Sequence, residues 1–277
     1  MLPKAVLPSG ETVPALGQGT WMMAERGGHK GDVAALRLGV ELGMTLIDTA
    51  EMYGEGKVES LVGEAVAGIR DKVFLVSKVY PHNASRKGVA VACTRSLRRL
   101  NTDRLDLYLV HWRGNIRLEE TVAGFEDLKR AGKIRHWGVS NFDTSDMEEL
   151  FRVPAGGACA ANQILYNLAR RGCEYELTPW LERHRIPVMA YSPFEQGRLQ
   201  VARALEHVAG AHNATPYQIA IAWLLGKPNT IVIPKSGCEA HVRENRKAAD
   251  IRLTKADLDA LDGAYKPPCK RKSLDVI

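Results

Sequence analysis

The sequence predicts a single α/β domain, residues 1–277, in which eight parallel strands and the helices between them close into a (β/α)8 barrel. Three observations predict this fold. Segments rich in β-branched and aromatic residues recur eight times, and a segment of helical period follows each one. Several of these strands, such as Phe74-Leu-Val and Val232-Ile, are apolar at successive positions, as strands of a parallel sheet buried on both faces require.

The predicted elements alternate along the chain without a linker or a break in composition, which favours a closed barrel over an open doubly wound sheet. The expected strands are residues 15–19, 45–49, 73–79, 105–111, 136–140, 160–165, 187–192 and 230–235. The expected helices are residues 32–42, 58–67, 88–100, 119–131, 144–150, 178–185, 215–225 and 239–248. Ahead of the first unit, residues 4–7 and 11–13 flank Pro8-Ser-Gly and predict a β-hairpin that closes the barrel floor.

The composition is that of a globular enzyme. With 277 residues, 45% of them hydrophobic, the chain supplies enough apolar surface for a sizeable core. Its longest apolar run, residues 219–225, is far shorter than the roughly 20 residues of a membrane-spanning helix. No signal-peptide pattern follows Met1, so we expect a cytoplasmic protein without a membrane partner. The five cysteines are far apart and form no CxxC, which predicts reduced thiols and neither a disulfide framework nor a zinc site.

The net charge of +6 raises the question of an anionic partner. The basic residues are spread along the chain and are not interleaved with aromatic residues, so we expect no nucleic acid partner. The one dense cluster, residues 266–272, is either a solvated tail or a phosphate or nucleic-acid patch. We expect no metal, because His207 and His212 are five residues apart, a poor ligand spacing.

Polar side chains interrupt the apolar runs where seven of the strands end, and in such barrels the active site is built at that face. Any one of them has an ordinary explanation, such as an aspartate that caps a turn. Seven on one face are harder to explain this way, because buried ionisable groups are costly unless they are paired. These residues are Asp48, Lys78, His111, Ser140 with Asn141, Gln163, Tyr191 with Ser192, and Lys235 with Ser236.

Tyr53 follows Asp48 in the loop over the same face, within Asp48-Thr-Ala-Glu-Met-Tyr-Gly. A free phenol has a pKa of about 10, too high for efficient proton transfer near neutrality. We expect the Lys78 ammonium to lower the pKa of Tyr53 and Asp48 to keep Lys78 in place and charged. His111 is then available to orient a substrate carbonyl. This set contains an acid and an electrophile but no reductant, which a cofactor must supply.

At these residues the sequence resembles the aldo-keto reductases, over nearly the whole chain. Residues 43–54 resemble the family's tyrosine segment, Val76-Ser-Lys-Val its lysine strand, and residues 105–112 its histidine strand. Gly138-Val-Ser-Asn-Phe and Ile233-Pro-Lys-Ser resemble two further signatures. The resemblance implies an NADP-dependent reductase of aldehydes or ketones. Its catalytic residues would be Tyr53, the general acid, with Asp48, Lys78 and His111.

The resemblance also implies how the cofactor binds. The family binds NADPH in an extended form without a Rossmann domain, and Gly17-Gln-Gly-Thr lacks the third glycine of the dinucleotide fingerprint. Gly19, Thr20 and Asp48 belong to the implied cofactor site; Ser140, Asn141 and Gln163 would hold the carboxamide and Tyr191 would stack on the nicotinamide. Ser192 would bind the pyrophosphate, Lys235 and Ser236 the 2′-phosphate, and Glu244 and Asn245 the adenine.

The sequence departs from the family pattern at His241, where many members carry an arginine over the adenine and its 2′-phosphate. This histidine either takes part in cofactor binding or is an exposed helix residue. Arginine provides a permanent charge and a bidentate fork, so a histidine should weaken the phosphate contact. We expect NADPH to remain preferred through Lys235, by a smaller margin, with NADH as the weaker alternative.

The loops around the mouth are short. Residues 193–199 lead directly into a helical stretch, and residues 113–117 follow His111, which predicts an open mouth and fast cofactor exchange. Trp21, Tyr80 and Trp112, with His111, are the expected substrate-pocket walls, although each aromatic residue could instead pack in the core. The tail, residues 265–277, either folds over the mouth or is loose.

Within the family, the sequence is most similar to the short-loop bacterial branch of methylglyoxal and 2,5-diketo-D-gluconate reductases. This implies small 2-oxoaldehydes such as methylglyoxal as substrates of a monomeric enzyme. Two other functions remain: a Schiff-base lyase that uses Lys78 or Lys235, and a non-catalytic NADPH sensor. Pairing with Asp48 would keep Lys78 charged and so argues against the first, and the intact Tyr53, Lys78 and His111 argue against the second.

Overall fold

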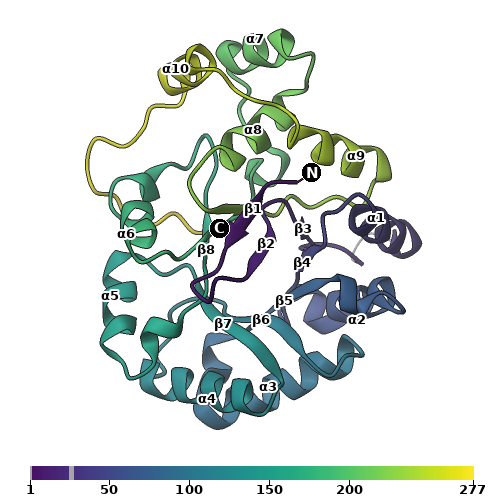
Figure 1. Cartoon of the computed structure of the whole chain (residues 1–277), viewed down its shortest axis with the longest axis vertical. Helices are drawn as coiled ribbons and strands as arrows, with labels where there is room; N and C mark the ends of the chain where they lie inside the picture. Colours follow the sequence, from purple (N-terminus) through teal and green to yellow (C-terminus); the bar gives the residue numbers. More distant parts are fainter. Residues whose placement is uncertain (1, 25–27) are drawn as a thin grey trace.

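The computed structural model describes residues 2–24 and 28–277. Eight parallel strands follow one another around a single sheet in chain order (Figure 1). Its first and last strands also meet, because Leu16 pairs with Val232 and Gly19 with Lys235 in parallel bridges. The predicted barrel is therefore confirmed. Its strands are β3 (Gln18–Gly19), β4 (Leu46–Asp48), β5 (Phe74–Val79), β6 (Leu105–Val110), β7 (Ile134–Ser140), β8 (Asn162–Leu165), β9 (Val188–Tyr191) and β10 (Thr230–Val232).

Helices surround the sheet on its outer side (Figure 1). They are α1 (His29–Glu41), α2 (Lys57–Val66), α3 (Arg86–Arg99), α4 (Leu118–Arg130), α5 (Thr144–Arg152), α6 (Leu177–Arg183), α7 (Arg203–Ala211), α8 (Pro216–Leu225), α9 (Glu239–Ala248) and α10 (Lys255–Ala264). The predicted eight are present within a few residues. The expected helical stretch after residue 199 is α7, whereas α10 was not predicted. Among the described helices, none has the length and apolar character needed to cross a membrane.

Local side-chain chemistry sets where several helices begin. Three of the described helices begin with a capping box, in which the capping side chain accepts a hydrogen bond from the backbone N–H of the residue three positions later. The side chain of that later residue in turn accepts from the backbone N–H of the capping residue. The capping residues are Asp143 before α5, Thr215 before α8 and Thr254 before α10. Such reciprocal caps satisfy two backbone donors that a helix start leaves free. Pro216 in the first turn of α8 needs no backbone donor there.

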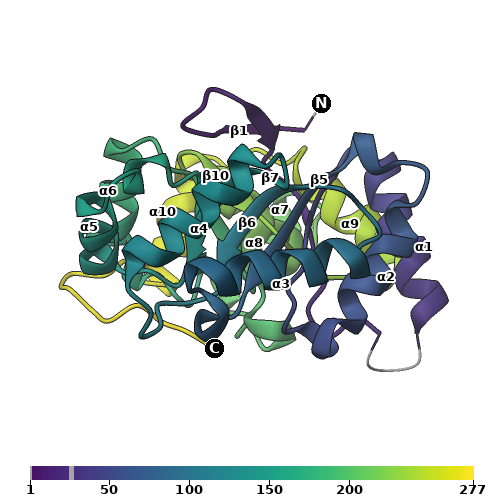
Figure 2. The same ribbon diagram turned by 90° about the horizontal axis from the view of Figure 1, so that it is seen from below.

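A hairpin closes the end of the barrel at which the strands begin, as predicted. Strands β1 (Lys4–Val6) and β2 (Thr12–Pro14) pair antiparallel, and their buried side chains Ala5 and Val13 join the apolar cluster that fills the barrel interior. In Figure 2 the hairpin lies on one face of the molecule and the end of the chain lies on the other. The hairpin therefore leaves the opposite mouth of the barrel for a ligand.

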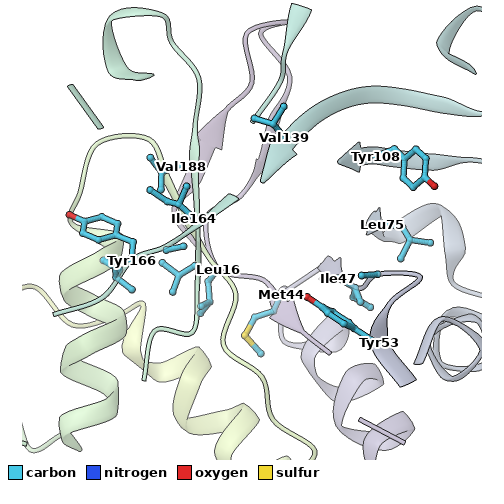
Figure 3. Close-up of a cluster of buried hydrophobic side chains, with 14 of the residues drawn as sticks. Leu16, Met44, Ile47, Tyr53, Leu75, Tyr108, Val139, Ile164, Tyr166 and Val188 are labelled. Atoms are coloured by element: carbon cyan, nitrogen blue, oxygen red, sulfur yellow. The ribbon is translucent and has the colours of Figure 1, made fainter. Parts of the chain in front are cut away.

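Two apolar clusters divide the core between the inside of the barrel and its outer layer. Along β5, Phe74 and Val76 belong to the inner cluster, whereas Leu75 between them belongs to the cluster that includes the helices. Figure 3 shows part of the outer cluster, with Leu75 and Tyr53 among its members. Because side chains alternate between the two faces of a strand, Lys78 at the end of β5 follows Phe74 and Val76 on the inner face. The same alternation brings the strand-end polar residues to one mouth.

Candidate active site

Lys78 lies at the centre of the predicted catalytic group. Its Nζ donates three hydrogen bonds: to Asp48 Oδ2 at 2.8 Å, to the Thr49 backbone oxygen at 2.9 Å and to the Tyr53 hydroxyl oxygen at 3.0 Å. The structure thus brings together Asp48 from β4, Lys78 from β5 and Tyr53 from the short 3-10 turn Tyr53–Gly56. All three side chains are buried.

These contacts determine where the phenolic proton can go. An ammonium group has three protons to donate, and here each has an acceptor, so Lys78 is fully satisfied only when charged. The Tyr53 oxygen accepts from Lys78 Nζ, which leaves its own O–H free to donate to a different acceptor. The geometry is therefore that of a proton donor supported from behind by a cation.

The pKa values correct one expectation. Burial is the largest influence on Tyr53 and raises its pKa, Lys78 lowers it, and Asp48 raises it, so that the pKa is above 10 and not below it as predicted. The physical reason is that desolvation of a phenolate in this enclosed position outweighs the nearby ammonium. Burial lowers the pKa of Lys78, but contact with Asp48 and Tyr53 outweighs that effect and raises it. Lys78 is therefore charged and Tyr53 protonated at neutral pH.

His111 follows β6 and lies beside the phenol. Its ring is edge-on to Tyr53 with centroids 5.8 Å apart. Burial, and secondly the charge of Lys78, lower the pKa of His111 to about 2. The imidazole is therefore neutral across the physiological range, and it can donate one hydrogen bond without carrying a charge. Its Nδ1 is buried and has no hydrogen-bond partner among the described residues.

The residues expected to hold the nicotinamide carboxamide form one connected network with the catalytic group. Gln163 Nε2 donates to Asp48 Oδ1 at 2.8 Å, and the Gln163 backbone oxygen accepts from Ser140 Oγ at 2.9 Å. Asn141 Nδ2 donates to the His111 backbone oxygen at 3.0 Å and to Ser140 Oγ at 3.1 Å. Tyr191 donates its hydroxyl proton to Asn141 Oδ1 at 2.9 Å.

The residues expected at the adenosine end form a second group around β10 and the start of α9. Lys235 and His241 are exposed, and neither forms an ion pair with another described residue. Glu244 is exposed on α9, whereas Asn245 is buried. Ser236 Oγ bonds the backbone of Cys238 just before α9. The bridge between Gly19 and Lys235 is the link from this group to the barrel.

Close approach of the chain explains Gly19 in that bridge. A Cβ at this position would lie 2.8 Å from the Ile233 backbone oxygen, so a side chain would separate the first and last strands. Its neighbour Thr20 is fully buried and donates from Oγ1 to the Asp48 backbone oxygen at 2.9 Å. Both residues therefore hold the catalytic strand in place from the side on which the barrel closes.

The expected pocket walls lie at the same mouth. Trp112 packs against His111 with centroids 5.1 Å apart and meets Tyr80 edge-on at 6.1 Å, and 37% of its surface is exposed. Trp21 lies two residues beyond the end of β3 and is 38% exposed. Such exposure at the mouth favours pocket walls over core packing for both tryptophans.

Glu51 supports this wall and was not singled out as a site residue. It lies two residues before Tyr53 and is buried, and its Oε1 accepts from the Tyr80 backbone N–H at 2.9 Å and from Asn83 Nδ2 at 3.1 Å. A carboxylate in the same motif as Asp48 and Tyr53 was the signal that could have identified it.

The tail, residues 265–277, lies over the mouth of the barrel, which is the first of the two alternatives that the sequence left open. Leu274 packs against the core. Burial raises the pKa of Tyr191, and the Ile277 backbone opposes this with a smaller lowering effect. Asp275 pairs with Arg170, which also contacts Glu195 in the loop after β9. Sequence patterns did not single out these three ionic residues, because they come from separate segments.

The chain is similar to known proteins over nearly its whole length. The chain matches the model of the aldo/keto reductase family over residues 15–266. It is 50% identical to methylglyoxal reductase YeaE of Escherichia coli K12, with all of both chains covered. A crystal structure of an aldo/keto reductase from Klebsiella pneumoniae in complex with NADP and acetate is 47% identical, with a TM-score of 0.96 and full coverage of both chains.

A crystal structure of a putative 2,5-diketo-D-gluconic acid reductase B is 31% identical, with a TM-score of 0.87, and covers 100% of this chain and 97% of its own. Both branches to which the sequence was compared are thus represented among its relatives. The family match covers the strands that carry Asp48 and Lys78, the position of His111 after β6, and the loop that carries Tyr53. The chain belongs to the aldo/keto reductase family.

Proposed function

We propose that this enzyme reduces small aldehydes and ketones with NADPH, with 2-oxoaldehydes such as methylglyoxal as its main substrates and Tyr53 as its proton donor. The observation that carries the proposal is the hydrogen-bonded group of Asp48, Lys78 and Tyr53, in which Lys78 Nζ contacts the phenol oxygen at 3.0 Å. The identity to a methylglyoxal reductase and the NADP complex of a similar structure support the substrate and the cofactor.

The residues at the mouth fit a nicotinamide cofactor. Ser140, Asn141 and Gln163 present polar groups beside the catalytic residues, and Tyr191 offers an aromatic face for stacking. At the adenosine end, Lys235 is an exposed cation with no anionic partner among the described residues, as a 2′-phosphate contact requires. Ser192, with a left-handed φ of 48°, is the residue we assign to the pyrophosphate.

When bound, the cofactor supplies a hydride to the carbonyl carbon of the substrate. The side chains of this protein then act on the carbonyl oxygen of the substrate. Tyr53 donates its proton to the carbonyl oxygen as negative charge develops there, and Lys78 stabilises the phenolate that remains. His111, being neutral, donates a hydrogen bond that orients the carbonyl. The products are an alcohol and the oxidised cofactor, so that electrons and protons balance.

The two alternative functions are less well supported. A Schiff-base lyase needs a neutral lysine amine, whereas contact with Asp48 and Tyr53 raises the pKa of Lys78. A non-catalytic sensor has no need of a proton donor held by a buried ion pair, at a cost in desolvation. A monomeric state, a cytoplasmic location and the lack of a nucleic acid partner stay predictions.

The decisive experiment compares wild type with Tyr53→Phe while NADPH oxidation is followed over a panel of aldehydes that includes methylglyoxal. We expect kcat to fall about 100-fold to 10,000-fold, the usual contribution of a general acid, with little change in NADPH affinity. Undiminished reduction by the variant would overturn the proposed mechanism. If the enzyme reduced only aldehydes that are not 2-oxoaldehydes, the proposed mechanism would stand and the proposed substrate class would be wrong.

A further inference from the structure

Asp48 is held from two sides, and only one of its partners is charged. Lys78 Nζ contacts Oδ2 at 2.8 Å, and Gln163 Nε2 donates to Oδ1 at 2.8 Å. Asp48 is 2% exposed and Gln163 is equally buried, so water does not replace either contact. A buried carboxylate is costly unless its oxygens accept hydrogen bonds, so the Gln163 amide is part of what stabilises and orients the Asp48 side chain.

The contacts form a continuous chain from β8 to the proton donor. Gln163 bonds Asp48, Asp48 bonds Lys78, and Lys78 bonds Tyr53. We propose that Gln163 is a positioning residue for proton transfer: its side-chain amide fixes Asp48 and thereby sets how strongly Lys78 stabilises the ionised form of Tyr53. The inference rests on the proposed function and assigns Gln163 a second role beside contact with the cofactor.

The direction of the effect follows from the geometry. Without the Gln163 amide, Oδ1 of Asp48 loses its donor and the carboxylate depends on Lys78 alone. The ammonium is then held closer to Asp48, and its charge stabilises the Tyr53 phenolate less. The titratable groups that face Tyr53 are Lys78, Asp48, His111 and Tyr191. Removing Gln163 changes the charge of none of them, so a change in Tyr53 ionisation reports the positioning of Asp48.

The Gln163 side-chain amide can also bind the cofactor. Gln163 Nε2 is committed to Asp48, whereas its Oε1 accepts no hydrogen bond from any other described residue. A side-chain amide has both a donor and an acceptor group, so one residue can hold Asp48 with its nitrogen and a carboxamide N–H with its oxygen. Cofactor binding and proton transfer therefore meet at this side chain.

The test measures Tyr53 ionisation in the cofactor-free protein. We would label the protein with 3-fluorotyrosine, which brings the phenols into a milder pH range, and follow fluorine NMR from pH 6 upward. The Tyr53 signal is assigned by its loss in Tyr53→Phe. The variant is Gln163→Leu, of similar size but without donors, with Gln163→Met as a second variant in case Leu disrupts folding.

The matched control is Ser140→Ala, which removes another expected carboxamide contact and the hydrogen bond to the Gln163 backbone oxygen but keeps the Gln163 amide and its contact with Asp48. We expect Gln163→Leu to raise the pH of Tyr53 ionisation by about half a unit or more, which corresponds to a fraction of the free energy of a hydrogen bond to a buried charge. We expect Ser140→Ala to leave the pH of Tyr53 ionisation unchanged. In the loaded enzyme the high-pH loss of reductase activity should shift upward in the same variant, since reduction requires protonated Tyr53.

A Tyr53 titration identical in wild type and both Gln163 variants would overturn the inference. So would an equal shift in Ser140→Ala, because a general loosening of the mouth would then explain both. If instead the wild type failed to reduce any carbonyl, the proposed function would fall while the cofactor-free titration still decided the role of Gln163.

Discussion

Asp275, two residues before the last residue, pairs with Arg170 of the loop after β8, with Asp275 Oδ1 and Arg170 Nη1 3.3 Å apart. The same guanidinium lies 3.2 Å from Glu195 Oε2, in the loop after β9. Asn167 Nδ2 also donates to Glu195 Oε1 at 2.8 Å and to the Ser192 backbone oxygen at 2.9 Å. The tail is thus tied to the loop that we assign to the cofactor pyrophosphate.

This connection predicts that the tail slows cofactor release. In Asp275→Asn we expect the dissociation rate of NADPH to rise about twofold to fivefold, since a partly exposed ion pair contributes up to about 1 kcal/mol. Stopped-flow fluorescence measures the rate. Asp259→Asn, which breaks an exposed pair with Lys255 on α10, is the matched control. Equal dissociation rates in wild type and Asp275→Asn would show that the tail does not retain the cofactor.

The open mouth and fast cofactor exchange expected from the short loops stay predictions, because the loops alone do not determine what lies over the mouth. Loop length was readable from the chain, but the position of the tail depends on ion pairs between segments about a hundred residues apart, such as Asp275 with Arg170. No local pattern encodes such a pair. The strand-end residues Asp48, Lys78 and His111 were predictable, because alternation along parallel strands and the family motifs both place them at one mouth.

Helix α10 was missed although its start is visible in the sequence. Thr254 and Asp257 form a capping box, a pattern that precedes many helices. The rise in the Tyr53 pKa could not be predicted from the sequence. It depends on how completely the folded chain excludes water from the phenol, and burial outweighed the neighbouring Lys78 there.

The pKa of His111 predicts an acid sensitivity of folding. In the unfolded chain a histidine has a pKa of about 6.5, whereas in the folded chain that of His111 is about 2. Between these values the unfolded state binds one more proton, so the free energy of unfolding falls as pH falls. His111→Gln removes this dependence. Relative to the variant, wild type should lose up to about 1.4 kcal/mol per pH unit below pH 5.5.

Urea unfolding of both proteins at pH 8, 6 and 4.5 measures that difference. The control is His207→Gln on α7, at an exposed position where the folded and unfolded states both meet water. A stability gap between wild type and His111→Gln that stays constant with pH would mean that His111 binds a proton equally well in the folded and unfolded states. That result would contradict the lowered pKa that supports its proposed role as a neutral donor.

His241 offers a test of cofactor preference. It is exposed on α9, six residues beyond Lys235, and forms no ion pair with another described residue. His241→Arg adds a permanent charge and a bidentate donor. We expect the ratio of kcat/KM with NADPH to kcat/KM with NADH to rise about threefold to tenfold, the range of a solvent-screened charged contact. The gain should shrink at high ionic strength.

His241→Gln, which adds no charge, is the matched control and should leave the ratio near that of wild type. An arginine that improved turnover with NADPH and NADH equally would show that position 241 does not face the 2′-phosphate. The preference for NADPH would then depend on Lys235 without help from α9.

Asp32 on α1 lies between the loop after β3 and the loop after β10. Its Oδ2 accepts from the Ala24 backbone N–H at 3.0 Å, and its Oδ1 would overlap with a Cβ placed on Gly237, next to Ser236. Gly237→Ala should therefore displace Asp32, cost about 1–3 kcal/mol of stability as overpacking does, and raise the KM for NADPH. In an Asp32→Ala background the added methyl group has room.

A double-mutant cycle isolates this contact, because additive costs are expected only for residues that do not touch. We expect Gly237→Ala to cost less in the Asp32→Ala background by about 0.5–3 kcal/mol in urea unfolding. Gly157→Ala, which places its methyl group in open space, is the control and should be additive with Asp32→Ala. If Gly237→Ala lowered the free energy of unfolding equally with and without the Asp32 carboxylate, contact with Asp32 would not be the reason for a glycine at position 237.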